Sequence, residues 1–309
     1  MTLSGFFTKI NFMRQKIEYF IETASAGTAA GPFLRSQGFS RHLMTWLKQK
    51  GGRILANGLP VFTNYVLRPG DLLTVYFPEP ETDGKILPAP VDFSIVYQDD
   101  DLLVIDKPAG VPVHPPPGNY TNTLANGLAL YFSQKGEPFA FHCINRLDRD
   151  TTGLLTAALH PLSASLLSAQ MAGRNIRRTY RALVLGRTAP SGTVRIPIGR
   201  RPGSIIERCP DWEHGAPAVT HYQTLAWFPG YSYLELHLET GRTHQIRVHM
   251  AAIGHPLLGE SLYHRGVSFP MARQALHSYA LEFTHPITKK AMRFTAPLPS
   301  DMQSWLDRS

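Results

Sequence analysis

The spacing of apolar residues predicts both helices and strands, in mixed order, along most of the chain. Ser40, a residue type that caps helices, precedes a segment in which Leu43 and Leu47 share one helical face. In residues 231–240, leucines alternate with polar residues, which is the period of a half-buried strand. Residues 245–253 return to the helical period. Because no steady strand–helix–strand repeat connects these segments, the sequence predicts an α+β fold with a mixed, largely antiparallel sheet.

Shorter patterns of the same two kinds predict the remaining elements. Residues 15–21 could form an edge strand, although the beginning of the chain is ambiguous. A hairpin is expected where Pro229 and Gly230 separate two strand-like segments. Elsewhere the patterns predict helices at 123–132 and 161–173 and strands at 102–108 and 177–186.

A change of composition near residue 80 divides the chain into two parts. Residues 31–78 combine a predicted helix and short strands with six cationic residues and a single acidic one, Asp71. The following segment is rich in proline and acidic residues, as extended linkers are. The sequence therefore predicts a small module at 13–80, a linker at 81–90 and a larger domain at 91–309.

The charge balance indicates the class of partner. The 309 residues include 31 Lys and Arg against 23 Asp and Glu, which gives a formal charge of +8 at pH 7. A basic surface favours polyanions such as nucleic acid or an anionic membrane, and the cationic module suits a reader of the RNA backbone. A soluble protein with a merely basic, solvated surface explains the same composition, and charge alone favours that explanation.

Cysteine content and the N-terminal segment indicate the compartment. Cys143 and Cys209 are the only cysteines, which excludes a disulfide-stabilised secreted scaffold and suits a reducing environment. Cations interrupt each apolar run near the N-terminus, so no secretory signal is predicted. We expect a cytoplasmic protein without membrane association, whether translation starts at Met1 or at Met13.

The segment from His142 to Leu155 contains the first candidate for chemistry. Asp148 lies between Arg146 and Arg149, close to a pair of leucines. Neighbouring arginines keep a half-buried carboxylate ionised, and an ionised carboxylate can act as a nucleophile or a base. The same pattern fits a structural aspartate that caps a turn, and the motif taken alone favours this structural interpretation.

A second cationic segment surrounds Tyr180. Residues 173–187 contain five arginines and no acidic residue, with Tyr180 near the middle. An aromatic ring among cations suits an unstacked RNA base, which needs a stacking face while its phosphates need positive charge. A core tyrosine on an exposed basic strand fits the same residues. Arg242 and Arg247 belong to a later segment, and one of them could reach Asp148.

Motifs for metals and nucleotide cofactors are missing from the sequence. His244 and His249 are five residues apart, a spacing that fits neither usual pair of ligands on one helical face. No H-E-x-x-H motif, paired C-x-x-C motif or glycine-rich phosphate-binding motif occurs. The three aspartates at 99–101 fit a turn ahead of a strand. The sequence therefore predicts no metal and no cofactor.

Five segments, in this order, resemble the RluA family of pseudouridine synthases. They are DDDLLVIDKPAGVPVHP (99–115), NRLDRDTTGLL (145–155), RRTYRALVLG (177–186), LETGRTHQIRVHMAAIGHPLLGE (238–260) and LHSYALEFTHP (276–286). Residues 31–78 are similar to the S4-like RNA-binding domain that often precedes this catalytic domain. The sequence departs from the family pattern where it has DKP in place of the NKP of many relatives.

The resemblance implies an RNA pseudouridine synthase, an isomerase that converts uridine to pseudouridine without metal or cofactor. It implies that Asp148 is the essential carboxylate, that Arg247 pairs with it, and that Tyr180 stacks on the target base and assists its deprotonation. The nucleotide must leave the base stack before its C1′ and C5 atoms can react. The same resemblance assigns to substrate binding Arg146, Arg242, His244 and Gln245.

Several alternatives stay open. Asp148 could attack C1′, attack the base, or promote a glycal-type intermediate. The S4-like module favours large-subunit ribosomal RNA as the substrate, with transfer RNA as the alternative. A non-catalytic RNA-binding protein could keep the same fold, but the presence of Asp148, Tyr180 and Arg247 together argues against it. A monomer is expected, because no segment has the pattern of an interface.

Overall fold

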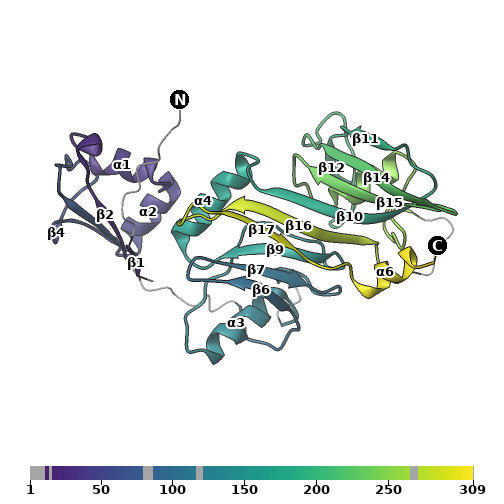
Figure 1. Cartoon of the computed structure of the whole chain (residues 1–309), viewed down its shortest axis with the longest axis horizontal. Helices are drawn as coiled ribbons and strands as arrows, with labels where there is room; N and C mark the ends of the chain where they lie inside the picture. The colour runs from purple at the N-terminus through teal and green to yellow at the C-terminus, as the bar shows by residue number, and fades with distance from the viewer. Residues whose placement is uncertain (1–10, 14–15, 79–85, 116–120, 265–270, 309) are drawn as a thin grey trace.

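The chain has an N-terminal module and a larger unit built on a long sheet, with helix α4 (Pro161–Ala172) between them (Figure 1). The linker predicted at 81–90 falls partly outside the described residues, and its described part, 86–90, contains no helix or strand. The computed structural model describes residues 11–13, 16–78, 86–115, 121–264 and 271–308.

The N-terminal module is a five-stranded sheet, in the order β1-β2-β5-β3-β4, packed against two helices. Its helix α2 begins as predicted, since Ser40 Oγ accepts the N–H of Leu43 at 3.1 Å. The strand expected at 15–21 forms as β2, but it is not an edge strand, because β1 pairs with its outer side. The bounds are β1 Asn11–Met13, β2 Lys16–Phe20, η1 Thr23–Ser25, α1 Ala30–Ser36, α2 Arg41–Gln49, β3 Arg53–Ala56, β4 Leu59–Pro60 and β5 Leu72–Tyr76.

A ten-stranded sheet forms the larger unit, in the order β11-β14-β15-β10-β16-β9-β7-β6, with β17 beside β16 and β8 beside β9. The pairing of β16 with β9 is parallel and the others in this sheet are antiparallel, which confirms the predicted α+β fold. Strands β12 and β13 form a separate hairpin-like pair. The bounds are β6 Ser94–Gln98, β7 Leu102–Lys107, β8 His142–Cys143, β9 Thr152–Ala158, β10 Arg177–Leu185, β11 Ser191–Val194, β12 Ile198–Arg200, β13 Arg208–Pro210, β14 Thr220–Phe228, β15 Tyr231–Leu238, β16 Leu276–Thr284 and β17 Ala291–Thr295.

Strands β7 and β9 are buried on both faces because helices cover each side of them. Ile105 of β7 belongs to a core cluster with α3 (Leu124–Gln134) and α5 (Gln245–Ala252), whereas the adjacent Val104 belongs to a cluster with α4. Neighbouring residues of a strand point to opposite faces, so α3 and α5 lie on one face and α4 on the other. A further helix, α6 (Ser300–Leu306), packs near the C-terminus.

A glycine allows the sheet to start directly after the segment that carries Asp148. Gly153 in β9 has a φ of +102°, and a Cβ there would lie 2.3 Å from the carbonyl oxygen of Ser278 in β16. Only glycine fits such a close approach of two backbones without displacing one of them. Local sequence thereby fixes where β9 meets β16, and with it the end of the preceding loop.

Candidate active site

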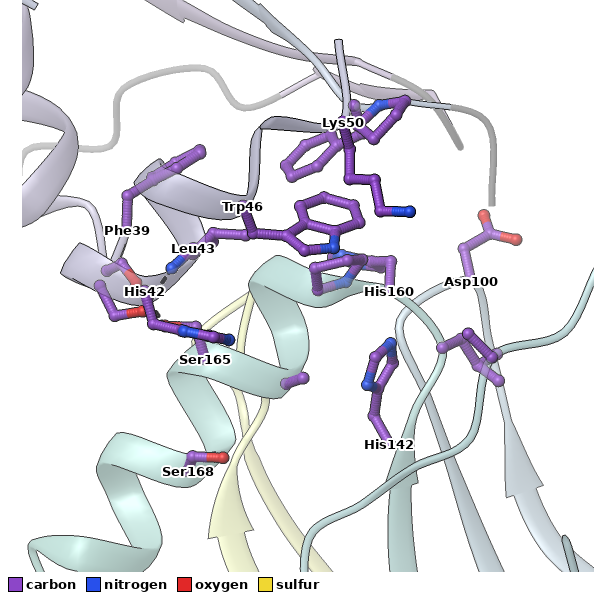
Figure 2. A pocket seen from close by; sticks show the side chains of 18 of the residues that line it. Phe39, His42, Leu43, Trp46, Lys50, Asp100, His142, His160, Ser165 and Ser168 are labelled. Carbon is purple, nitrogen blue, oxygen red and sulfur yellow. Dashed lines mark hydrogen bonds between the residues drawn. The ribbon is translucent and has the colours of Figure 1, made fainter. Parts of the chain in front are cut away.

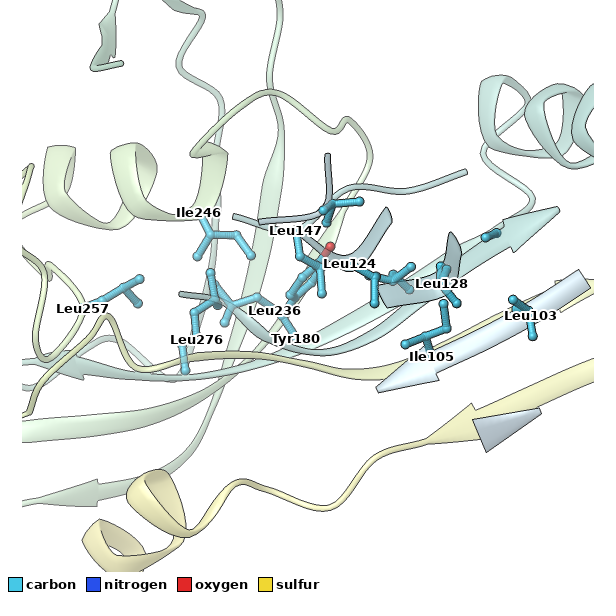
Figure 3. Packing of buried hydrophobic residues seen from close by; sticks show 14 of the residues in the cluster. Leu103, Ile105, Leu124, Leu128, Leu147, Tyr180, Leu236, Ile246, Leu257 and Leu276 are labelled. Atoms are coloured by element: carbon cyan, nitrogen blue, oxygen red, sulfur yellow. The ribbon is translucent and has the colours of Figure 1, made fainter. Parts of the chain in front are cut away.

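Asp148 lies in the loop between β8 and β9, and this loop packs against the hydrophobic core. The preceding Leu147 is buried beside Tyr180 and Ile246 (Figure 3), while 23% of the Asp148 side chain is exposed on the other side. The carbonyl of Asp148 accepts the N–H of Thr151 at 3.1 Å. The turn is therefore closed by backbone atoms, which leaves the carboxylate available to other partners.

Lys107, at the end of β7, fastens the same loop from inside. Its side chain is fully buried, and Nζ donates to the carbonyl oxygens of Pro108, Val111 and Arg149 at 2.7, 2.9 and 2.8 Å. Burial lowers the pKa of Lys107 to about 7. Because Arg149 directly follows Asp148, this ammonium group determines where the loop backbone lies. Lys107 was not among the predicted site residues, although a lysine that ends a buried apolar strand was a usable signal.

Arg247 of α5 is the cation that reaches Asp148. Its Nη1 lies 3.5 Å from Oδ2 of Asp148, and its side chain is 6% exposed. Glu260 binds the rest of the guanidinium group, with Nε to Oε2 at 2.8 Å and Nη2 to Oε1 at 2.6 Å. Burial acts to lower the pKa of Arg247, but Glu260 and Asp148 raise it above its ordinary value, so the group stays charged.

Glu260 is a residue that the sequence did not indicate. Its side chain is completely buried, and Oε1 also accepts the N–H of Leu262 at 2.9 Å. Two carboxylates share the single positive charge of Arg247, and the shorter contacts are those of Glu260. Asp148 is therefore oriented by Arg247 without being fully neutralised, and its charge faces the more open side. A lone glutamate 13 residues beyond its partner gives no local signal.

His244 approaches Asp148 from the start of α5. Its backbone is in the left-handed region, with φ 58° and ψ 20°, and its Nε2 lies 3.9 Å from Oδ1 of Asp148. Nδ1 lies 2.6 Å from the hydroxyl of Tyr263, whose oxygen accepts the N–H of Arg208 at 3.0 Å. The Tyr263 proton is thus available to Nδ1, which favours a proton on Nε2 facing Asp148. Burial lowers the pKa of His244, consistent with a neutral ring.

A pocket of about 380 Å³ opens beside Asp148, and Tyr180, Arg146 and Arg242 line it. Tyr180 is 4% exposed, and burial raises the pKa of its hydroxyl, which keeps it protonated at neutral pH. Arg146 and Arg242 are exposed, and Arg242 Nε donates to the carbonyl of Pro217 at 3.1 Å. The pocket combines an aromatic wall, cations and two carboxylates, those of Asp148 and Glu239.

Gln245 also lines this pocket, but its amide group binds the protein itself. Oε1 accepts from the hydroxyl of Thr240 at 2.8 Å and from the N–H of Arg242 at 3.0 Å. Nε2 donates to the carbonyl of Val219 at 2.9 Å and to the Thr220 hydroxyl at 3.0 Å. These bonds hold the loop that carries Arg242. Contact of Gln245 with a substrate stays a prediction.

One cluster in the described part of the chain has ligand atoms close enough for a metal ion. Asp99, Asp101 and His285 each offer an atom, and these lie within 4.8 Å of one another. Hydrogen bonds already occupy them: His285 Nε2 is 2.8 Å from Asp99 Oδ2, and His160 Nε2 is 2.6 Å from Asp101 Oδ1. Residues 99–101 connect β6 to β7, as the predicted turn does. That the protein needs no metal stays a prediction.

Comparisons with known proteins decide the family. A family model described as RNA pseudouridylate synthase matches residues 101–252. The uncharacterised RNA pseudouridine synthase YjbO of Bacillus subtilis is 44% identical over 268 residues, which cover 86% of this chain and 93% of the relative. The chain belongs to the RNA pseudouridylate synthase family. Ribosomal large subunit pseudouridine synthase D of Neisseria meningitidis is 36% identical over 276 residues, covering 85% of this chain and 73% of the relative.

Solved structures agree with this family. Human RNA pseudouridylate synthase domain containing 4 aligns with a TM-score of 0.58 at 25% identity, over 70% of this chain and 92% of that one. Human RNA pseudouridylate synthase domain containing 1 aligns with a TM-score of 0.54 at 27% identity, over 67% and 83%. The predicted resemblance to this family and the predicted α+β catalytic fold are confirmed, whereas the S4-like nature of the N-terminal module stays a prediction. The chain is an isomerase that converts uridine to pseudouridine in RNA. Among the described helices, none is long and apolar enough to cross a membrane.

Proposed function

We propose that the chain modifies a uridine of large-subunit ribosomal RNA and that Asp148 is its essential carboxylate. The observation that carries the proposal is the unequal sharing of Arg247, which lies 3.5 Å from Asp148 but 2.6 and 2.8 Å from Glu260. This arrangement orients the Asp148 carboxylate toward the pocket, while the short hydrogen bonds of Arg247 go to Glu260. The Neisseria meningitidis relative, named for the ribosomal large subunit, supports the class of RNA.

The reaction balances without an added reagent. The bond from C1′ to N1 of the uracil breaks and a bond from C1′ to C5 forms, while C5 loses a proton and N1 gains one. A nearby carboxylate stabilises a sugar carbon that becomes electron-poor, or bonds to it or to the base. All three routes require a carboxylate oxygen of Asp148 that is free to approach the nucleotide, and the 3.5 Å contact with Arg247 leaves one available.

The other pocket residues hold the nucleotide in this proposal. Tyr180 gives the flipped base a ring to pack against, and its protonated hydroxyl serves as a hydrogen-bond donor. Arg146 and Arg242 bind the phosphates on either side of the target. Gln245 holds the loop that carries Arg242, and His244 faces Asp148, so their contact with RNA is indirect or limited to the pocket edge.

The organisation of the chain follows from the same proposal. Residues 13–80 act as an S4-like RNA-binding domain, 81–90 as a linker and 91–309 as the catalytic domain. The enzyme works as a monomer in the cytoplasm, where its ribosomal substrate is assembled. Six cationic residues against one acidic residue in 31–78 support an RNA-binding role for the first of these parts.

A map of pseudouridine in ribosomal and transfer RNA tests the proposal. Cells that lack the gene are compared with cells complemented by the wild type or by Asp148→Ala. We expect one or more sites in large-subunit ribosomal RNA to disappear and to return only with the wild type. Sites that return with Asp148→Ala would refute the role of Asp148. Sites lost only from transfer RNA would refute the substrate class.

A further inference from the structure

A cleft separate from the Asp148 pocket lies between the N-terminal module and the larger unit. Its volume is about 1310 Å³, compared with about 380 Å³ for the pocket at Asp148. Residues of α2 line one side, and α4 with residues just before β8 line the other (Figure 2). None of the roles proposed for the pocket residues uses this larger cavity.

The cleft and the pocket are neighbours, because two elements line both of them. In β8, His142 faces the cleft and the next residue, Cys143, lines the pocket. In α4, Ser168 lines the cleft, and Met171, almost one turn later, lines the pocket. RNA whose target nucleotide occupies the pocket continues beyond it, so its flanking nucleotides can pass along α4. The 12 residues of this helix span about 18 Å, the length of about five nucleotides at the 3.4 Å rise of a stacked strand.

Charge favours a polyanion along the module side of the cleft. Acidic side chains lie on the opposite wall, where Asp99 is already hydrogen-bonded to Tyr97 and His285. Phosphates are attracted to the module side and repelled from the other, which determines the side on which an RNA backbone lies. The basic side chains of the module wall are exposed and comprise Arg35, Arg41, His42 and Lys50.

Trp46 provides a ring for a base in the same cleft. It belongs to α2 and is partly buried against the core of the module. Figure 2 shows its indole projecting over the end of α4 near His160, between the positions of His42 and Lys50. An aromatic ring beside a cationic side chain, here Lys50, is an arrangement by which proteins bind single-stranded RNA without reading its sequence.

We propose that this cleft is a second RNA-binding site, in which a nucleotide flanking the target uridine stacks on Trp46 and its phosphates contact Arg41 and His42. The inference rests on the proposed function, since it concerns the same RNA. In this proposal, α2 binds the RNA strand that leaves the pocket and runs along α4. RNA long enough to reach α2 then binds more tightly than RNA that fills the pocket alone.

Fluorescence anisotropy with the full-length chain tests this site. Two labelled oligouridylates, of about three and about ten nucleotides, serve as probes, and only the longer one spans α4. We expect Trp46→Ala to weaken binding of the longer probe roughly tenfold, and Trp46→Phe to retain most of the affinity. Arg41→Glu should weaken it as well. Lys48→Glu is the matched control, because Lys48 is exposed on the same helix but does not line the cleft.

Three results would overturn the second site. One is wild-type affinity of Trp46→Ala for the longer probe. Another is an equal loss of affinity for the longer probe in Lys48→Glu and Arg41→Glu, which would place the RNA on the side of α2 that faces away from the cleft. The third is an equal loss for the short probe in Trp46→Ala. A separate conversion assay with Asp148→Asn distinguishes the two proposals: normal conversion by that variant refutes the role of Asp148 and leaves the binding results intact.

Discussion

Two charged clusters of the larger unit differ in how completely their carboxylates are hydrogen-bonded. Asp99 accepts from Tyr97 at 2.6 Å, from His285 at 2.8 Å, and from the N–H groups of Asp101 and Leu102 at 2.8 and 3.0 Å. Asp148 has a guanidinium at 3.5 Å and an imidazole at 3.9 Å. The first carboxylate is saturated by protein donors, and the second is oriented but left open.

The difference teaches how to tell a structural carboxylate from a reactive one. A carboxylate with four short hydrogen bonds, such as Asp99, gains stability from them and has no lone pair left to offer a substrate. A carboxylate beside a pocket, with its cation held mainly by another acid, stays available for bond formation. A histidine contacts both carboxylates, so its presence does not distinguish them, whereas the distance and the number of the donors do.

The largest expected effect comes from removing the charge at the open cluster. Asp148→Asn keeps the shape of the side chain, and we expect it to lower the conversion rate by about a thousandfold or more. Because Asp148 makes only long contacts, the melting temperature should stay close to the wild-type value. Single-turnover conversion of RNA and thermal unfolding measure the two quantities. If Asp148→Asn kept activity within tenfold of the wild type, Asp148 would not be a reactive carboxylate and would not differ from Asp99 in this respect.

The next effect tests whether Glu260 positions Arg247. Glu260→Gln leaves a buried guanidinium with a weaker partner, which we expect to cost about 3 kcal/mol of unfolding free energy. Arg247 should then move toward Asp148 and neutralise it, so kcat falls more than KM rises. Denaturant unfolding and steady-state kinetics are the measurements, with Glu260→Asp as the charge-conserving control. A loss of stability at unchanged kcat would reduce Glu260 to a purely structural residue.

Asp99→Asn should show the opposite pattern at the saturated cluster. Tyr97 and His285 donate to Oδ2, and two backbone N–H groups donate to Oδ1. An amide has only one acceptor oxygen, so one of these pairs loses its acceptor, and we expect a loss of about 2 kcal/mol in unfolding free energy. Single-turnover conversion at saturating RNA should match the wild type, since Asp99 lines the cleft but not the Asp148 pocket. Activity lost in proportion to that of Asp148→Asn would contradict the structural role.

Acid should weaken the saturated cluster in a defined range of pH. Burial acts to raise the pKa of Asp99, but hydrogen bonds from His285, Tyr97 and two backbone N–H groups lower it well below its ordinary value of 3.8. A group with a depressed pKa in the folded state contributes stability above its unfolded pKa and loses it as the pH falls toward the folded pKa. Melting temperatures between pH 5 and pH 2 should therefore fall less in Asp99→Asn than in the wild type.

The smallest effect is expected from metal ions. Hydrogen bonds already occupy the atoms that Asp99, Asp101 and His285 could offer. Addition of Mg²⁺ or Mn²⁺ after treatment with EDTA should change neither the melting temperature nor the conversion rate. A rise of several degrees that disappears in Asp101→Asn would identify the cluster as a metal site and refute the prediction of no metal.

Local sequence patterns predicted where helices and strands form more reliably than which of these elements pack or pair with one another. The helix after Ser40 and the helix that begins at Pro161 were predicted because caps and periodicity act within one or two turns. The edge position of residues 15–21 was wrong, since it depended on whether another strand pairs with β2. Pairing between strands is a tertiary contact that an apolar pattern does not specify.

The sequence by itself determined the fold class, the family and the segment that contains Asp148, because these depend on residue types in a fixed order. Only the tertiary structure decided that Arg247 is shared with Glu260, that Lys107 fastens the Asp148 loop, and that a cleft beside α4 adjoins the pocket. These contacts join residues far apart, 99 positions for Arg247 and Asp148 and 42 for Lys107 and Arg149. A periodic pattern predicts that a residue is buried, but which side chain it contacts depends on the packing of the whole chain.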